Sequence, residues 1–307
     1  MKLVLFDDFK LGVLKDGSVF DAMSAVSDIP RLHPQDLMNG LIARFADYRG
    51  KLDALTKGKG VPVGQVKLRA PLPRPATIVC MAVNYMEDGT KTEAPLINAF
   101  HKSPSSVIGD GETMILPDVP ATVFEGEAEL AVVIGKPASH VKAADAMGHI
   151  FGYMNFIDGS ARNLPPPLGV FFQSKSRDTF APMGPCIVTA DEIPDPQKLQ
   201  VRLWVNGRLT QNFNTDDMAH KIPRCIEWLS SIHALVPGDV VATGTNHRGL
   251  SAFQDGDKVE LEIDGLKRLT INIRDELKRT WGRETRLERQ DKGLEPISPQ
   301  RTGKYAQ

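Results

Sequence analysis

The sequence predicts an α+β fold that is rich in β-strands. Short apolar runs dominated by β-branched residues recur along the chain, with turn dipeptides such as Asp-Gly and Asn-Gly between several of them. Few segments show helical periodicity. A chain of 307 residues can hold one large domain with a small appendage. We expect a small N-terminal accessory unit at 1–70, a main domain at 71–281 and a charged C-terminal tail at 282–307.

Composition and charge limit the partners of the chain. The formal net charge of -1 gives no overall field toward nucleic acid or a membrane. No apolar run approaches membrane-spanning length, and the apolar stretch at the N-terminus is too short for a signal peptide. The three cysteines have no paired spacing, so we expect buried, reduced thiols. We therefore expect a cytoplasmic protein with neither nucleic acid nor a membrane as its partner.

The first 64 residues are predicted to form a hairpin followed by a helix. Asp16-Gly17 lies between two apolar runs, which is a strong hairpin signal. Residues 34–51 place apolar side chains on one helical face. Prolines at 71, 73 and 75 then form a stiff connector. Nothing in this unit indicates chemistry.

The main domain is predicted to contain strands, hairpins and two helices. Buried strands are expected at 77–83, 130–134, 152–157 and 240–245, hairpins turning at Asn206-Gly207 and Asp264-Gly265, and helices at 143–151 and 223–232. The residues after about 280 are highly charged and have little to bury. We expect this tail to be mobile or to wrap around a partner subunit.

The strand at 130–134 extends backward into a stretch with three glutamates. Glu125, Glu127 and Glu129 fall on one face because side chains alternate along a strand. Carboxylates at the entrance to a buried strand repel one another and are costly to desolvate. A hard divalent cation such as Mg²⁺ takes oxygen ligands and would neutralise them. The alternative is that these glutamates lie at an exposed end of the strand. The spacing alone favours this alternative.

Six segments in a fixed order identify a family resemblance. They are residues 78–85, 102–106, 127–135, 152–162, 175–185 and 238–245. Together they resemble the fumarylacetoacetate hydrolase (FAH) family over roughly residues 78–281. The resemblance implies an FAH-type mixed β-roll as the fold of the main domain, a catalytic role for that domain, and a homodimer as the assembly.

The resemblance also implies a metal site. Two glutamates spaced i, i+2 and a later aspartate hold Mg²⁺ or Mn²⁺ in the family, and they correspond here to Glu127, Glu129 and Asp158. Three carboxylates leave coordination positions open for a substrate. Glu125 is left as a supporting or solvent-facing residue. Arg162 is expected to pair with an acid.

Further site residues follow from the same motifs. Lys175 matches the active-site lysine of the family, where a positive charge stabilises a developing enolate, and Lys102 matches a basic residue that faces the substrate. Tyr85 and Thr245 are expected to bind substrate. Arg177 stands where the family commonly has an aromatic residue, and it either binds a substrate carboxylate or is a solvated charge.

The chain departs from the hydrolytic members after Tyr85. Those members have a histidine three residues later and a glutamate three further on, and the pair activates water, whereas this chain has Asp88 and Lys91. An aspartate is ordinarily a much weaker base than a histidine. Asp88 and His247 are the predicted catalytic replacements. Glu87, Glu93 and His101 remain open as alternatives.

The function implied is metal-dependent cleavage of a C–C bond in a 2,4-dioxo acid from a degradative pathway. A 2,4-dioxo acid of the acylpyruvate type can chelate the cation through its carboxylate and keto oxygens. A decarboxylase or an isomerase of a 2-oxo acid is the close alternative, because the same enolate serves both and neither needs an activated water. A non-catalytic binding or scaffold member is the alternative from another class.

Overall fold

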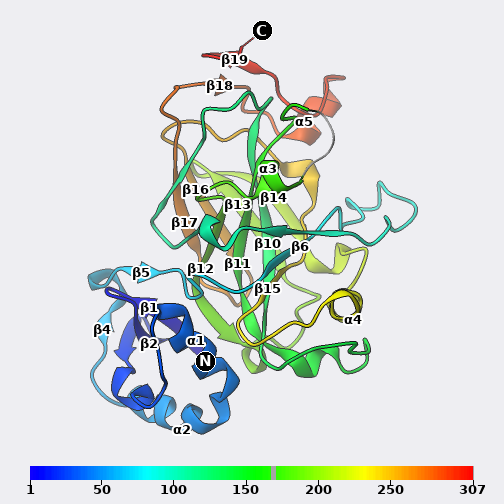
Figure 1. Cartoon of the computed structure of the whole chain (residues 1–307). Coiled ribbons are helices and arrows are strands. Elements are labelled where there is room, and N and C mark those ends of the chain that lie inside the picture. The colour runs from blue at the N-terminus through cyan, green and yellow to red at the C-terminus, as the bar shows by residue number, and fades with distance from the viewer. Residues whose placement is uncertain (167–170, 307) are drawn as a thin grey trace.

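The computed structural model describes residues 1–166 and 171–306. Figure 1 shows long central strands, with the N-terminal unit packed against one end of them and the C-terminal tail at the opposite end. The helices are α1 Pro34–Ala43, α2 Phe45–Leu55, α3 Phe171–Lys175, α4 Ile222–Ile232 and α5 Arg286–Asp291, and short 3-10 turns lie between the other elements. The protein is a sheet-rich, mixed α+β fold.

A twelve-stranded sheet joins the N-terminal unit to the main domain. Its order is β4-β3-β2-β1-β12-β11-β10-β15-β6-β7, with β5 beside β1 and β8 beside β12. The strands are β1 Lys2–Phe6, β2 Lys10–Lys15, β3 Ser18–Asp21, β4 Val61–Pro62, β5 Leu68–Arg69, β6 Ile78–Met81, β7 Ala99–Lys102, β8 Val107–Ile108, β10 Phe124–Ile134, β11 Ile150–Ala161, β12 Ala181–Thr189 and β15 Val240–Ala242.

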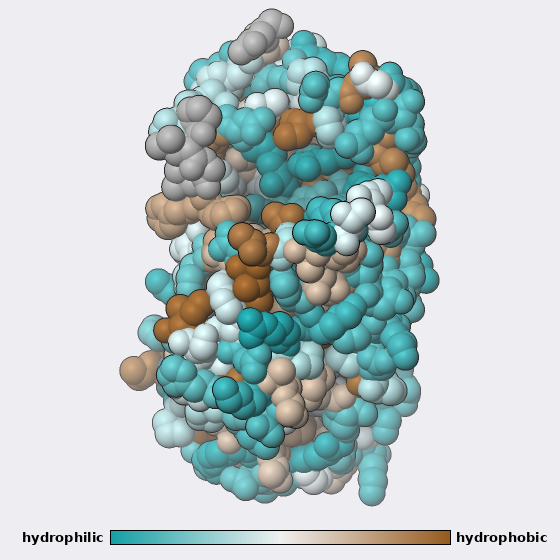
Figure 2. Space-filling view, turned by 90° about the vertical axis from the view of Figure 1, so that its right-hand side faces the viewer, coloured by the Kyte–Doolittle hydropathy of each residue, from teal (hydrophilic) through white to brown (hydrophobic). Residues whose placement is uncertain are grey.

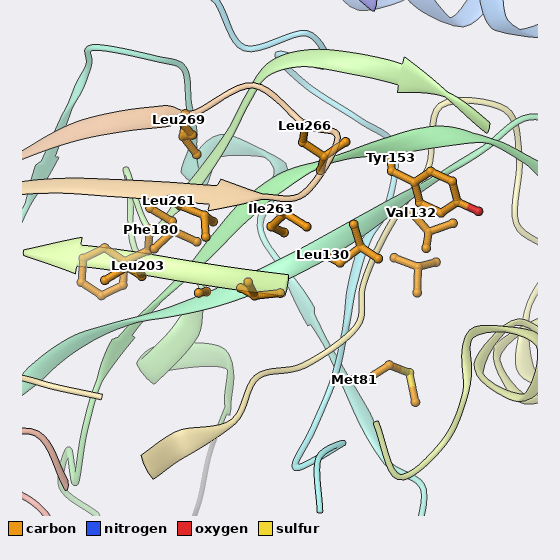
Figure 3. Close-up of a cluster of buried hydrophobic side chains, with 14 of the residues drawn as sticks. Met81, Leu130, Val132, Tyr153, Phe180, Leu203, Leu261, Ile263, Leu266 and Leu269 are labelled. Atoms are coloured by element: carbon orange, nitrogen blue, oxygen red, sulfur yellow. The ribbon is translucent and has the colours of Figure 1, made fainter. Parts of the chain in front are cut away.

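A second sheet packs against the first. Its order is β14-β13-β16-β17-β9, and β18 pairs with β19 in the tail. The strands are β9 Thr113–Ile115, β13 Gln200–Val205, β14 Arg208–Asn214, β16 Lys258–Ile263, β17 Leu269–Arg274, β18 Thr280–Trp281 and β19 Gln300–Thr302. Figure 3 shows the core between the sheets, where Leu130 of the first lies near Ile263 of the second.

Strand β10 is buried on both of its faces. Leu130 and Val132 belong to the core between the sheets, whereas Ala131 and Val133 belong to a second core shared with the N-terminal unit. This double burial explains the continuous apolar run at its C-terminal half. The three glutamates of its N-terminal half alternate onto the same face as Ala131 and Val133.

Most predicted elements are confirmed. The hairpins turn at Asp16-Gly17 and Asn206-Gly207, and a third joins β16 to β17 through residues 264–268. The helix predicted at 223–232 is α4, with a proline in its first turn. The predicted helix over 34–51 is divided at Arg44 into α1 and α2. All three cysteines are free and buried, as expected.

The helix predicted for 143–151 is wrong. A 3-10 turn covers only Ala146–His149, and β11 begins at Ile150. Ile150 pairs with Ile134 of β10, and Gly135 N–H donates to the carbonyl of His149 at 2.7 Å. Pairing with the sheet therefore overrides the local helical preference of this segment.

The tail contacts the main domain of its own chain, and its wrapping around a partner subunit stays a prediction. Trp281 is buried against Phe124 and donates from its indole nitrogen to the carbonyl of Thr122 at 2.7 Å. Arg286 of α5 donates to both carboxylate oxygens of Glu125, at 3.0 and 2.5 Å. These contacts were missed because the tail is anchored through charges on its own chain rather than through an apolar stripe.

The boundary near residue 70 stays a prediction, since β1 continues the large sheet by pairing with β12. Across residues 1–166 and 171–306, no helix has both the length and the apolarity needed to cross a membrane.

We expect Gly152→Ala to destabilise the sheet. An alanine Cβ there would lie 2.3 Å from the carbonyl oxygen of Val188, a backbone atom that cannot move aside. The free energy of unfolding should fall by about 2 kcal/mol or more, measured by urea denaturation. Gly50→Ala is the matched control, because nothing lies within 4 Å of its added Cβ in α2. It should raise stability by up to about 1 kcal/mol. Equal effects of the two changes would contradict the clash.

Glu125→Gln tests the anchor of the tail. Burial alone would raise the pKa of Glu125, but Arg162 and Arg286 hold it below its usual value of 4.5. The folded pKa is depressed, so the stabilisation is present above the unfolded pKa and is lost as pH falls through the folded one. The variant should be about 3 kcal/mol less stable at pH 7, with the gap narrowing below about pH 4.5.

The control for this change is Glu276→Gln, at a side chain that is 75% exposed and pairs with Arg274. Its free energy of unfolding should match that of the wild type at every pH. A gap for Glu125→Gln that stays constant from pH 7 to pH 3 would show that the charge of Glu125 does not stabilise the fold.

Candidate active site

Cross-strand register brings three carboxylates together. Glu127 of β10 is directly opposite Asp158 of β11, and Glu129 lies two residues further along the same face of β10. One carboxylate oxygen from each of the three lies within 4.8 Å of the others, and all three residues are buried. The three predicted metal ligands therefore form one cluster, the carboxylate triad.

The triad carries unequal charge. Burial alone would raise the pKa of Glu127, but Lys175 and Arg162 hold it well below its usual range. Burial and the charges of Asp158 and Glu127 raise the pKa of Glu129 well above its usual range. The side chains of Lys175 and Arg162 therefore stabilise the ionised form of Glu127, whereas the ionised form of Glu129 lacks comparable stabilisation.

Two lysines contact the triad. Lys175, the last residue of α3, donates from Nζ to Glu127 Oε1 and to Asp158 Oδ2, each at 2.6 Å. Lys102, the last residue of β7, donates to Asp158 Oδ1 at 2.5 Å. Burial alone would lower the pKa of Lys175, but Asp158 and Glu127 raise it, so the ammonium stays charged at neutral pH.

The loop after β15 holds Glu129 in place. Gly244 N–H donates to Glu129 Oε2 at 2.7 Å. Gly244 has a φ of 89°, and a Cβ on it would lie 3.0 Å from that of Asn84, so a glycine is required for this close approach. The hydroxyl of Thr245, in the same loop, accepts from Gln211 Nε2 at 2.9 Å.

A histidine and a glutamate form a dyad beside this loop. The Nδ1 atom of His247 lies 2.7 Å from Glu87 Oε1, and the backbone N–H of His247 donates to Glu87 Oε2 at 2.9 Å. Burial alone would raise the pKa of Glu87, but the hydrogen bond and charge of His247 lower it. Glu87 is therefore ionised at neutral pH and orients the imidazole with Nδ1 protonated.

The hydrogen bonds of Asp88 and Arg177 are to residues outside the triad. Asp88 Oδ2 is 3.0 Å from Arg248 Nη1, and Asp88 is half-exposed, so its carboxylate points to a partner other than the triad. Arg177 donates from Nε to the carbonyl of Gln173 at 2.7 Å. The hydroxyl of Tyr85 is buried and, among the residues described, has no hydrogen-bond partner. Burial raises the pKa of Tyr85 well above its usual range, so this hydroxyl remains a donor.

Sequence reasoning missed several supporting residues. Gln211 of β14 accepts from Ala128 N–H at 3.0 Å, and so ties the backbone between Glu127 and Glu129 to the Thr245 loop. Ser160 donates to Glu127 Oε1 at 3.1 Å. Arg162 joins Glu125 to Glu127, as its expected pairing with an acid requires. Only strand alternation could have indicated Ser160, because it shares the face of Asp158.

The donor set fits a divalent cation. Three buried carboxylates converge, one of them is left without a cationic partner, and their oxygens are the ligands that Mg²⁺ and Mn²⁺ prefer. Within the described part of the chain, this is the one group of three or more acidic, histidine or cysteine side chains with suitable spacing.

Comparison with known proteins finds a matching family model. The family model "Fumarylacetoacetate (FAA) hydrolase C-terminal" matches residues 77–274. Oxaloacetate tautomerase YisK of Bacillus subtilis is 37% identical over 225 residues, which cover 69% of this chain and 74% of that protein.

Solved structures of similar shape are also enzymes. Maleylpyruvate hydrolase from Sphingobium sp. SYK-6, with manganese(II) and pyruvate, has a TM-score of 0.81 and 34% identity, over 90% of this chain and 99% of that one. A 2-hydroxyhepta-2,4-diene-1,7-dioate isomerase from Mycobacterium marinum has a TM-score of 0.71 and 29% identity, over the same shares. The chain is therefore an enzyme of the fumarylacetoacetate hydrolase family, whose members here include a hydrolase, an isomerase and a tautomerase.

Proposed function

We propose that the enzyme hydrolyses a C–C bond of a 2,4-dioxo acid of the acylpyruvate type, with Mg²⁺ or Mn²⁺ held by Glu127, Glu129 and Asp158. The observation that carries the proposal is the Glu87–His247 dyad, whose imidazole is near enough to act electrostatically on Glu127 of the carboxylate triad. It supplies a base for water activation that neither Asp88 nor Lys91 offers. When bound, the cation supplies Lewis acidity to the keto oxygen of the substrate.

The dyad would move the proton of the attacking water. With Nδ1 committed to Glu87, the basic nitrogen of His247 is Nε2, which has no hydrogen bond to any residue of the described chain. Water gives its proton to Nε2, and the hydroxide adds to the C4 carbonyl carbon. The C3–C4 bond then breaks, its electron pair enters the enolate of pyruvate, and C3 takes the proton back from the imidazole.

The lysines would stabilise the negative charge that develops. The ammonium of Lys175 is fixed by two carboxylates of the triad, and that of Lys102 by Asp158, so neither has to reorient when the enolate forms. The buried hydroxyl of Tyr85 is a further donor for substrate oxygen. Thr245 and Arg177 remain proposed substrate contacts.

A tautomerase acting on oxaloacetate is the second candidate. It is favoured by the 37% identity to the Bacillus subtilis tautomerase. Keto–enol exchange needs a proton shuttle at C3 and no attacking water, so the same dyad could serve. A decarboxylase of a 2-oxo acid is the third possibility. The homodimer, the degradative pathway and the cytoplasmic location stay predictions.

Turnover separates these candidates. With Mg²⁺ or Mn²⁺, an acylpyruvate should yield pyruvate and a second acid in equal amounts. Chromatography measures both products. Glu129→Gln should weaken Mn²⁺ binding at least tenfold, and activity should fall with it. Loss of a residue that only supports a metal ligand already costs roughly tenfold in affinity. Glu276→Gln, at an exposed acid, is the control and should match the wild type.

The same assay includes oxaloacetate. Exchange between its keto and enol forms without acid products from any acylpyruvate would establish the tautomerase, and release of CO₂ would establish the decarboxylase. Wild-type turnover that needs no divalent cation would contradict the proposed role of the triad.

Substitution of the dyad should separate proton transfer from metal binding. His247→Asn should lower kcat about 100-fold or more, and Glu87→Gln about 10-fold to 100-fold, because general acid–base catalysis contributes factors of this size. Mn²⁺ affinity should stay close to that of the wild type in each variant. The double variant should be no slower than His247→Asn alone, since two groups that act as a unit are not additive. Multiplicative losses would show that the two residues act separately.

A further inference from the structure

The Glu87–His247 dyad borders an open cavity. Both residues line a space of about 390 Å³, and they lie in the loop after β6 and in the short turn after β15. Figure 2, which faces the side where the loop after β6 lies in Figure 1, shows a hollow lined by hydrophilic side chains in the upper half of the surface. Because neither residue belongs to a strand or a long helix, their alignment depends on contacts from the interior.

The backbone at Glu87 needs support from its surroundings. Glu87 and Asp88 have φ values of 58° and 55°, and Gly89 follows with a φ of 78°. Residues other than glycine rarely adopt this left-handed conformation, and it persists only where the surrounding structure holds it. The position of the Glu87 carboxylate therefore depends on the contacts that fix this turn.

Asp217 fixes the turn on both sides of Glu87. It ends the 3-10 turn Thr215–Asp217, which follows β14. Its backbone carbonyl accepts from Met86 N–H at 2.9 Å, and its Oδ2 accepts from Asp88 N–H at 3.1 Å. The residues before and after Glu87 are therefore both held by Asp217.

Gln211 of β14 fixes the other half of the dyad. Its Nε2 donates to the carbonyl of Asn246 at 2.9 Å, and the N–H of the next residue, His247, donates to Glu87 Oε2 at 2.9 Å. The peptide unit that precedes the imidazole is thus held at its oxygen by Gln211 and at its N–H by Glu87. The Gln211 amide is buried, and its Oε1 accepts from Ala128 N–H, so both ends of the amide are engaged.

One segment of the second sheet therefore supports both members of the dyad. Asn246 contacts both supporting residues, since its Nδ2 donates to Asp217 Oδ2 at 3.4 Å and its carbonyl accepts from Gln211. Strand β14 belongs to the second sheet, whereas β6 and β15 belong to the first. The dyad is aligned from a sheet that carries neither of its members.

We propose that Gln211 and Asp217 are positioning residues that align the Glu87–His247 dyad. The inference rests on the proposed function and deepens it, because it extends the base from two residues to a network anchored in the second sheet. Asp217 acts on the dyad alone. Gln211 also holds Ala128, which lies between two of the proposed metal ligands.

Two substitutions of Asp217 separate its hydrogen bonds from its charge. Asp217→Ala and Asp217→Asn both remove the negative charge, but asparagine keeps an oxygen that can accept from Asp88 N–H. Asp217→Ala should lower kcat for an acylpyruvate about tenfold, because misplacement of a catalytic group slows a reaction by factors of this size. KM and the Mn²⁺ affinity measured by calorimetry should stay close to those of the wild type. Asp217→Asn should recover most of the loss in kcat.

The matched control is Asp216→Ala. Asp216 lies in the same turn, and its side chain is exposed. This variant should keep the kcat, KM and Mn²⁺ affinity of the wild type. A loss in kcat as large as that of Asp217→Ala would show that any change in this turn disturbs the enzyme, and it would overturn the specific role of Asp217.

A double variant tests whether Asp217 acts through the imidazole. Asp217→Ala added to His247→Asn should cost little or no further kcat, because a positioning residue then has nothing left to align. Multiplicative losses would show that Asp217 acts elsewhere and would overturn the proposal for it.

Gln211→Met tests the second positioning residue. Methionine fills similar space without the hydrogen bonds, and urea denaturation checks that the variant is folded. Both kcat and Mn²⁺ affinity should fall, each by about tenfold, since Ala128 N–H and the Asn246 carbonyl lose their partner together. A folded variant that keeps both values would overturn the role of Gln211.

Failure of this inference is distinguishable from failure of the proposed function. If Asp217→Asn is as slow as Asp217→Ala while His247→Asn is also slow, the charge of Asp217 matters rather than its hydrogen bonds. That result would overturn the positioning role and leave the proposed function standing. Wild-type hydrolysis that His247→Asn leaves intact would overturn the dyad as the base, and the positioning role would fall with it.

Discussion

The pairing of Glu127 with Asp158 across two buried strands is the constraint on which the site depends. The antiparallel register places these residues opposite each other, and alternation adds Glu129 to the same face. Carboxylates this close, removed from water, cannot all ionise without positive charge nearby. Lys175, Lys102 and Arg162 supply part of that charge, and the raised pKa of Glu129 marks where it is still lacking.

The architecture explains how so polar a cluster is tolerated inside a sheet. Along β10, the face that carries the glutamates continues as Ala131 and Val133, which pack in the core shared with the N-terminal unit. The opposite face of the strand contributes Phe124, Ala128, Leu130, Val132 and Ile134 to the large hydrophobic core. The strand is therefore held in the core by one face. On its other face, the N-terminal half carries the carboxylates. Rigid strands position charged groups better than loops do.

How far the sequence could predict this site depended on the range of the interactions. Alternation alone placed three glutamates on one face, but only the family resemblance separated Glu125 from the ligands and added Asp158. The structure supplies the reason, since Arg162 and Arg286 already neutralise Glu125. Turn dipeptides predicted the hairpins because they act locally. The helix prediction for 143–151 was wrong because pairing with β10 determines the conformation at the end of this segment, and no local sequence pattern indicates that pairing.

The dyad is the clearest case of information that a single sequence does not carry. Glu87 and His247 are 160 residues apart, and each was only one of several candidates for a missing base. The fold brings them together because β6 and β15 are parallel neighbours, so the loops that follow both strands leave the sheet at the same edge. A base lost from one loop can thus be replaced from the adjacent one. The same edge carries Lys91 and Arg248, and the tail closes over it with Arg286. The two residues of the proposed base are therefore held together at one edge of the sheet.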